Sequence, residues 1–174
     1  MADEAAFSVV MLIFRFLVGL TFASHGWMKR FGPGGIDGTA GWFDSIGMSP
    51  GKRHAVIAST TEMGAGALLA IGLLTPFAAA GMIGVMVVAG WAVHRRNGFF
   101  IVGNGWEYTF VVGLVAAVIA GFGPGRWSID HALGLSDDFA GYTALVIAVV
   151  LGVAVGIAQL ALFYRPAEST PAGA

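Results

Sequence analysis

The chain has 174 residues, of which 57% are hydrophobic and 11% are charged, and its mean hydropathy is +0.80. A soluble domain of this composition would expose far too much apolar surface to water. Cysteine is absent, which excludes disulfides, thiolate catalysis and thiolate-ligated metal centres. The formal net charge of −1 says little about partners, and no basic patch typical of nucleic-acid binding is present.

The apolar residues gather in long runs along the chain. A helix of roughly 20 apolar residues crosses the hydrocarbon core of a bilayer, about 30 Å thick, and satisfies its own backbone hydrogen bonds there. The short alternating strands that a membrane barrel requires do not occur. The sequence therefore predicts an all-α membrane protein with transmembrane helices at Ala6–Arg30, Arg53–Leu74, Phe77–His94, Trp106–Phe122 and Gly141–Tyr164.

The segments between these runs carry turn and capping signals. Residues 31–52 contain Gly32-Pro33-Gly34-Gly35 and then a Trp-Phe pair, which predicts a turn followed by a short interfacial or re-entrant helix. Pro76 predicts a tight hairpin between the second and third helices. After the stop at residues 123–125, Ser128 and Asp130 are expected to cap a short surface helix over Asp130–Leu135. Residues 166–174 are expected to form a disordered tail.

Small residues at helical spacing predict close helix contacts. Gly152 and Gly156 form a Gly-x-x-x-Gly pair in the last apolar run. Such pairs let two helix backbones approach closely in a membrane, and this one is expected to pack the fifth helix against a partner.

The distribution of Lys and Arg predicts the orientation. The acidic residues Asp3 and Glu4 are not typical of a cleaved signal peptide, so the first run is expected to remain a transmembrane helix. Seven basic residues fall on one side of the predicted bundle: Lys29, Arg30, Lys52, Arg53, Arg95, Arg96 and Arg165. Only Arg126 falls on the other side. The positive-inside rule then places the N-terminus outside and the C-terminus in the cytoplasm.

Two charged residues fall deep within the predicted helices. A charge at mid-helix costs about 2.5 to 3.5 kcal/mol on insertion scales, so each needs a partner or a wet cavity. Arg15 is about 12 Å from the outer end of its helix and Glu62 is about 15 Å from the opposite end of the next helix. These similar depths predict a buried ion pair, which serves either helix packing or a ligand or proton site.

A second group of polar and aromatic residues is expected at the cytoplasmic end. His25 and Lys29 are four residues apart and share a helix face, and the ends of the third and fourth helices approach the same level. An imidazole near a carboxylate and aromatic rings suits a quinone headgroup. The alternative is that the Trp and Lys residues are interfacial anchors and that a histidine caps a helix. The candidate ligand-binding residues are His25, Lys29, His94, Trp106 and Glu107.

The remaining residues form an ordered pattern along the chain. It comprises Arg15, Gly19, Phe22, His25-Gly26, Lys29, Trp42-Phe43, Gly47, Glu62, Gly64, Gly66, Gly72 to Pro76, Phe99-Phe100, Glu107 and Gly123-Pro124-Gly125-Arg126-Trp127-Ser128-Ile129-Asp130. This pattern, over about residues 7–131, resembles the DoxX family of bacterial membrane proteins. The resemblance implies a four-helix core over residues 1–135 with Asp130 in its closing motif. The predicted helix over residues 141–164 is additional to this four-helix core and is the point at which the chain departs from the family pattern.

The resemblance also implies a class of function. The family takes its name from membrane subunits associated with thiosulfate:quinone oxidoreductase, and related members are linked to redox homeostasis. It therefore implies a bacterial plasma-membrane subunit that binds quinone and couples a soluble oxidoreductase to the membrane. A non-catalytic scaffold for redox enzymes and a small lipid or solute carrier remain as alternatives, although no inverted repeat supports a carrier. No motif for a nucleotide, a metal or a hydrolytic triad is found.

Overall fold

The computed structural model describes residues 2–166, which are almost entirely helical. In chain order the α-helices are α1 (Ala2–Phe31), α2 (Gly35–Ser45), α3 (Gly51–Ile71), α4 (Thr75–Ala89), α5 (Glu107–Phe122), α6 (Ile129–Ala132) and α7 (Gly141–Phe163). A π-helical turn at Gly90–His94 and a 3-10 turn at Arg95–Asn97 continue α4, and a further 3-10 turn covers Ile101–Gly103. The expected all-α class is confirmed.

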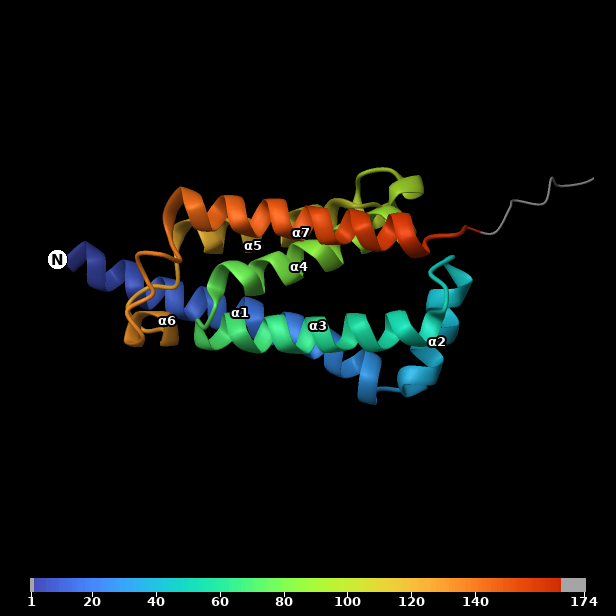
Figure 1. Cartoon of the computed structure of the whole chain (residues 1–174), viewed down its shortest axis with the longest axis horizontal. Coiled ribbons are helices and arrows are strands. Elements are labelled where there is room, and N and C mark those ends of the chain that lie inside the picture. Colours follow the sequence, from blue (N-terminus) through green and yellow to red (C-terminus); the bar gives the residue numbers. More distant parts are fainter. Residues whose placement is uncertain (1, 167–174) are drawn as a thin grey trace, which may run out of the picture.

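The helices form two layers that are joined at one end (Figure 1). The antiparallel helices α1 and α3 make one layer, and α4, α5 and α7 make the other. Helix α2 lies at the end where α1 finishes, and α6 lies at the opposite end with the hairpin between α3 and α4. Asp3–Phe31, Gly51–Ile71, Thr75–Asn97 and Gly141–Phe163 are long and apolar enough to span a membrane, and α5 is a shorter apolar helix. The predicted bundle with an added C-terminal helix is therefore confirmed.

Glycine and alanine allow the helices to pack closely. A Cβ atom on Gly26 would lie only 2.6 Å from the Ser59 carbonyl oxygen of α3, so no side chain fits there. In the second layer, a Cβ on Gly152 would lie 2.7 Å from the Ala80 oxygen and one on Gly156 would lie 3.0 Å from the Gly84 oxygen. The Gly152 and Gly156 pair thus packs α7 on α4 of the same chain. The expectation that this pair binds a partner is wrong.

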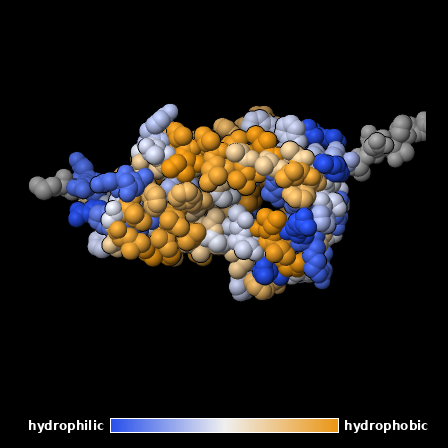
Figure 2. Space-filling view, in the orientation of Figure 1, coloured by the Kyte–Doolittle hydropathy of each residue, from blue (hydrophilic) through white to orange (hydrophobic). Residues whose placement is uncertain are grey.

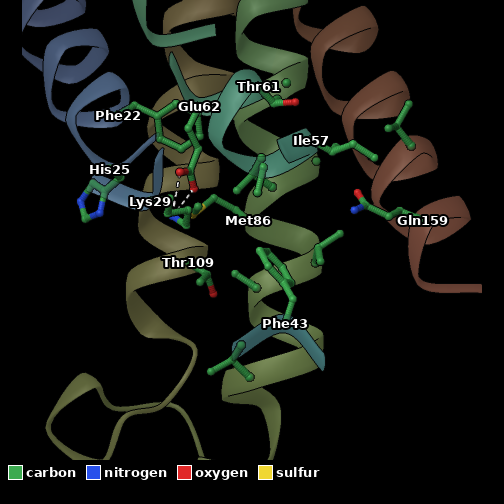
Figure 3. Close-up of a pocket in the computed structure, with 18 of the residues that line it drawn as sticks. Phe22, His25, Lys29, Phe43, Ile57, Thr61, Glu62, Met86, Thr109 and Gln159 are labelled. Carbon is green, nitrogen blue, oxygen red and sulfur yellow. Dashed lines mark hydrogen bonds and ion pairs between the residues drawn. The ribbon is translucent and has the colours of Figure 1, made fainter. Parts of the chain in front are cut away.

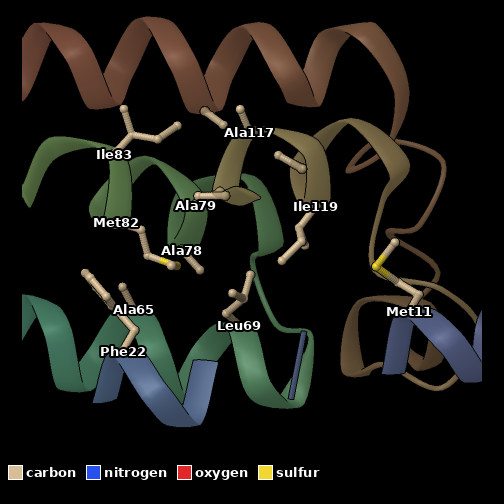
Figure 4. Packing of buried hydrophobic residues seen from close by; sticks show 13 residues of the cluster. Met11, Phe22, Ala65, Leu69, Ala78, Ala79, Met82, Ile83, Ala117 and Ile119 are labelled. Atoms are coloured by element: carbon tan, nitrogen blue, oxygen red, sulfur yellow. The ribbon is translucent and has the colours of Figure 1, made fainter. Parts of the chain in front are cut away.

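The interior is filled largely by alanine together with some larger apolar side chains, whereas many large apolar side chains face outward. Leu69, Met82 and Ile119 are fully buried among alanines of α4 and α5 (Figure 4). Large apolar residues such as Val10 and Leu17 are exposed, at 64% and 56%, and Figure 2 shows a broad apolar surface between two more polar ends. This inversion of a soluble fold is expected where lipid, not water, surrounds the bundle.

The connecting segments largely follow the sequence-based expectations. Helix α2 forms after the glycine-rich turn, and Thr75 and Pro76 begin α4 directly after α3 ends. The Ser128 hydroxyl accepts the His131 N–H at 3.1 Å and caps α6, as expected. Helix α6 ends at Ala132, earlier than predicted. Of the predicted tail, residues 167–174 lie outside the described residues.

The two ends of the bundle generate a topology prediction. The C-terminal end of α7 lies at the same end as α2 and the arginines that follow α4 (Figure 1). A reporter fused after Ala174 should therefore behave as cytoplasmic, and one inserted near Asp137 and Asp138 as external. Alkaline phosphatase and fluorescent-protein fusions would measure this. The same result at both positions would contradict an odd number of spans.

Candidate functional site

Arg15 is almost completely buried and is held by backbone carbonyl groups. Its side chain is 1% exposed, and a Cβ on Gly72 would lie 2.9 Å from its Cζ atom. The guanidinium donates to the carbonyl oxygens of Pro124 (3.1 Å), Leu69 (3.4 Å), Ala70 and Trp127. The predicted ion pair between Arg15 and Glu62 is therefore wrong.

The packing register of α1 against α3 explains this error. Gly19 lies against Gly66 and Gly26 lies against Ser59, so the beginning of α1 faces the end of α3. Gly72, which touches Arg15, is ten residues beyond Glu62, or about 15 Å along a helix. Depths counted from the ends of apolar runs do not determine which residues of two helices lie side by side.

Asp130 has a structural role at the same end of the bundle. This fully buried carboxylate accepts the Leu74 N–H at 2.7 Å, the Thr75 N–H at 3.0 Å and the Thr75 hydroxyl at 2.7 Å. These groups begin α4, whose free N–H groups need an acceptor. Asp130 thus caps α4 and not α6, and it anchors the α3–α4 hairpin to the segment that follows α5.

Glu62 pairs with Lys29, near the other end of the bundle. Both carboxylate oxygens lie 2.7 Å from the Lys29 Nζ atom, and the Glu62 side chain is only 4% exposed, whereas that of Lys29 is 26% exposed. The pair satisfies a charge that would otherwise be costly at this depth. Figure 3 shows it between α1 and α3, facing the second layer.

The Lys29–Glu62 pair lines a cavity of about 670 Å³ between the two layers. Helices α1, α2, α3, α4, α5 and α7 all contribute to its wall. Most of the lining is apolar, including Phe22, Phe43, Ile57 and Met86, and the polar side chains are His25, Lys29, Thr61, Glu62, His94, Asn104, Tyr108, Thr109 and Gln159. An apolar cavity of this size with a few convergent polar groups is typical of a small-molecule site.

Three of the five predicted ligand-binding residues lie at this cavity. His25, Lys29 and His94 line it. The His25 Nε2 atom lies 3.5 Å from the Tyr108 hydroxyl. The His94 Nδ1 atom lies 2.9 Å from the Asn104 carbonyl oxygen.

The other two predicted residues lie outside the cavity. The Glu107 carboxylate accepts the Ile101 N–H at 2.8 Å, so it closes the loop before α5. Trp106 packs edge-on against Phe99, with ring centroids 4.7 Å apart, and lines a different groove. Trp106 and Glu107 lie at the start of α5, next to the cavity residue Tyr108, but neither of them lines the cavity.

Sequence reasoning missed several cavity residues. Tyr108 follows Glu107 directly, and one helical position turns a side chain by about 100°, so Tyr108 faces inward where Glu107 does not. Gln159 is a carboxamide in the apolar C-terminal half of α7, where its Nε2 atom lies 3.0 Å from the His54 Nδ1 atom, and a polar group within a span is itself a signal. Phe43 comes from α2, whose position over the cavity only the tertiary structure reveals.

Comparisons with known proteins agree with this architecture. The sequence model of the DoxX family matches residues 10–95. The chain is also 30% identical, over 135 residues, to an uncharacterized membrane protein of Mycobacterium tuberculosis, which covers 71% of this chain and 80% of the relative. No solved structure matches the chain. The family match includes Arg15, His25, Lys29, Glu62 and His94, and ends before α5.

The charge partners can be tested by double-mutant cycles. Because Lys29→Met or Glu62→Gln leaves its partner without an opposite charge, each should lower the free energy of unfolding in detergent. The double mutant should lose less stability than the sum of the two single losses, by about 1 kcal/mol or more. Arg15→Met and Glu62→Gln should instead be additive within about 0.5 kcal/mol. Strong coupling in the second cycle, or none in the first, would contradict this geometry.

Proposed function

Because the chain belongs to the DoxX family of membrane proteins, we propose that it is a membrane subunit of a redox system. It binds a quinone or a similar lipid-soluble ligand in the cavity lined by Lys29 and Glu62. The observation that carries this proposal is an ion pair between the partly buried Lys29 ammonium and the buried Glu62 carboxylate at a largely apolar cavity of about 670 Å³. Membership of the family supports the membrane role, and the polar groups at the cavity support the proposed ligand class.

The cavity suits the two parts of a quinone. Its apolar and aromatic wall, with Phe22 and Phe43 among the lining residues, offers surface to a planar ring and an isoprenoid chain. A quinone carbonyl oxygen needs a hydrogen-bond donor. Lys29 carries three N–H donors, and both Glu62 oxygens lie 2.7 Å from its nitrogen. Its third donor is then available to a ligand.

A redox role also requires protons at the ligand. Reduction of a quinone to a quinol consumes two electrons and two protons. His25 is exposed and lines the cavity, and an imidazole ring has nitrogen atoms that both donate and accept protons. We propose that the His25 imidazole passes protons from the aqueous side to the ligand oxygens, while the Glu62 carboxylate, which accepts hydrogen bonds from Lys29, holds the Lys29 ammonium in place.

The electrons require a partner protein. The chain has no cysteine and no motif for a bound nucleotide or flavin. We propose that a reduced soluble oxidoreductase docks at the α2 end of the bundle and supplies them. Lys52 and Arg96 are exposed at this end, and such residues steer an acidic partner surface.

The proposal predicts which substitutions weaken ligand retention. His25→Ala and Glu62→Gln should each lower the affinity for ubiquinone or menaquinone about tenfold, because each removes one charge-assisted contact or its support. The measurements are quinone extraction after purification in mild detergent and titration of the delipidated protein. The matched controls are His131→Ala, on α6 at the opposite end, and Glu107→Gln, whose carboxylate bonds to the loop. Both should bind like the native chain.

The outcomes separate the alternatives. If the native protein repeatedly yields no quinone, and the His25 and Glu62 variants still couple normally to a soluble partner, the quinone site is excluded. Partner association that is lost instead through Lys52→Glu or Arg96→Glu would then favour a scaffold. If His131→Ala lowers quinone affinity as much as His25→Ala does, the loss is a general effect of histidine removal, and this result would also count against the site.

A further inference from the structure

A second groove lies on the other side of α4 from the cavity. It has a volume of about 960 Å³ and is bounded by α4, α5 and α7. Met86 and Thr109 line both spaces and so separate them. The groove is open to the surface of the bundle, since Phe110 and Ile157 on its wall are 52% and 55% exposed. Its wall is otherwise almost wholly apolar, as expected for a surface that contacts acyl chains.

At one end of this groove the side chain of Arg95 lies against two aromatic rings. The Arg95 guanidinium lies 4.3 Å from the centroid of the Trp91 ring and 5.9 Å from that of Tyr164. Among the residues that the structure describes, no carboxylate pairs with Arg95. The carboxylate of Glu107, at the start of α5, accepts the Ile101 N–H, and Glu107 does not line the groove. The groove therefore presents one positive charge to whatever occupies it.

At the C-terminal end of α4, neighbouring residues face different spaces. The π-helical turn at Gly90–His94 adds a residue to the turn and is often associated with functional sites. As a result His94 lines the cavity between the layers, whereas Trp91 and Arg95 line the outer groove. A Cβ on Gly90 would lie 3.1 Å from the Thr109 hydroxyl oxygen, so α4 and α5 are close together here.

We propose that this groove binds one anionic phospholipid. An acyl chain lies along α4, α5 and α7, and the phosphate binds Arg95 at the end of the groove. Stacking on Trp91 holds the guanidinium plane and leaves its N–H edge for phosphate oxygens, a geometry in which arginine excels. From Ile83 to Arg95 the groove follows α4 for about 18 Å, which accommodates most of an acyl chain.

The position of the charge fits the chemistry of the membrane surface. Trp91, Tyr164 and Arg95 lie together at the end of the apolar wall, and such residues are typical of the interface between acyl chains and headgroups. The distribution of Lys and Arg predicts that this end faces the cytoplasm, where anionic lipids attract basic residues. The site differs in location and in ligand class from the proposed quinone site and does not rest on it.

Native mass spectrometry of the whole chain in mild detergent tests the proposal. The probes are dioleoylphosphatidylglycerol and dioleoylphosphatidylcholine, which share acyl chains and differ in net charge. The delipidated protein should bind one molecule of the anionic lipid about tenfold more tightly. Arg95→Gln should remove this preference. Arg96→Gln is the matched control, because Arg96 is the neighbouring arginine and does not line the groove. It should keep the preference.

A second variant tests the acyl-chain part of the groove. Gly113 lines the groove, and a Cβ there would lie 3.8 Å from the Met86 Cβ atom, an ordinary contact. Gly113→Leu should therefore fold, fill the groove and weaken binding of both lipids. Equal binding of the two lipids by the native protein would overturn the proposal. Equal loss in the Arg95 and Arg96 variants, or unchanged binding in the Gly113 variant, would do the same.

Discussion

The burial of Arg15 is the constraint on which the arrangement of the two layers depends. A guanidinium inside a bilayer must be satisfied by protein groups, and here the carbonyl groups come from the end of α3 and from the segment after α5. Asp130, in that segment, caps the start of α4. Together these two side chains bind the layers at the hairpin end, and the layers diverge toward α2 (Figure 1). The cavity lies in the divergent part.

Charged side chains inside the bundle therefore fall into two kinds. Arg15 and Asp130 form hydrogen bonds mainly with backbone groups, so these two charges stabilise the fold. Lys29 and Glu62 are satisfied by each other at the wall of a cavity. The second arrangement places both charged groups at the wall of an open space instead of enclosing them among backbone groups. This difference in partners, more than the presence of charge, separates structural residues from candidate functional ones.

Helix α7 shapes both spaces beside α4. Its Gly152 and Gly156 allow close contact with α4, while Gln159 and other residues of α7 line the inner cavity and Ile157 lines the outer groove. The matched family region, residues 10–95, ends before this helix. The central charged pair thus lies in the matched region, and part of the wall around it comes from a helix beyond that region.

The sequence by itself determined the class of protein, the number of spans and the hairpin and turn positions, because the bilayer demands long apolar helices and the turn residues interrupt them. It also predicted that His25, Lys29 and His94 lie at the same end of the bundle, and these residues do line one cavity. Only the tertiary structure decided that Glu62 pairs with Lys29 and that Arg15 binds carbonyl groups. It likewise decided that Glu107 faces a loop while Tyr108 faces the cavity. Hydropathy reports depth along the membrane normal, whereas the partner of a side chain depends on the register between helices and on rotation about each helix axis. Those two quantities are set by close packing at positions such as Gly19, Gly26 and Gly66.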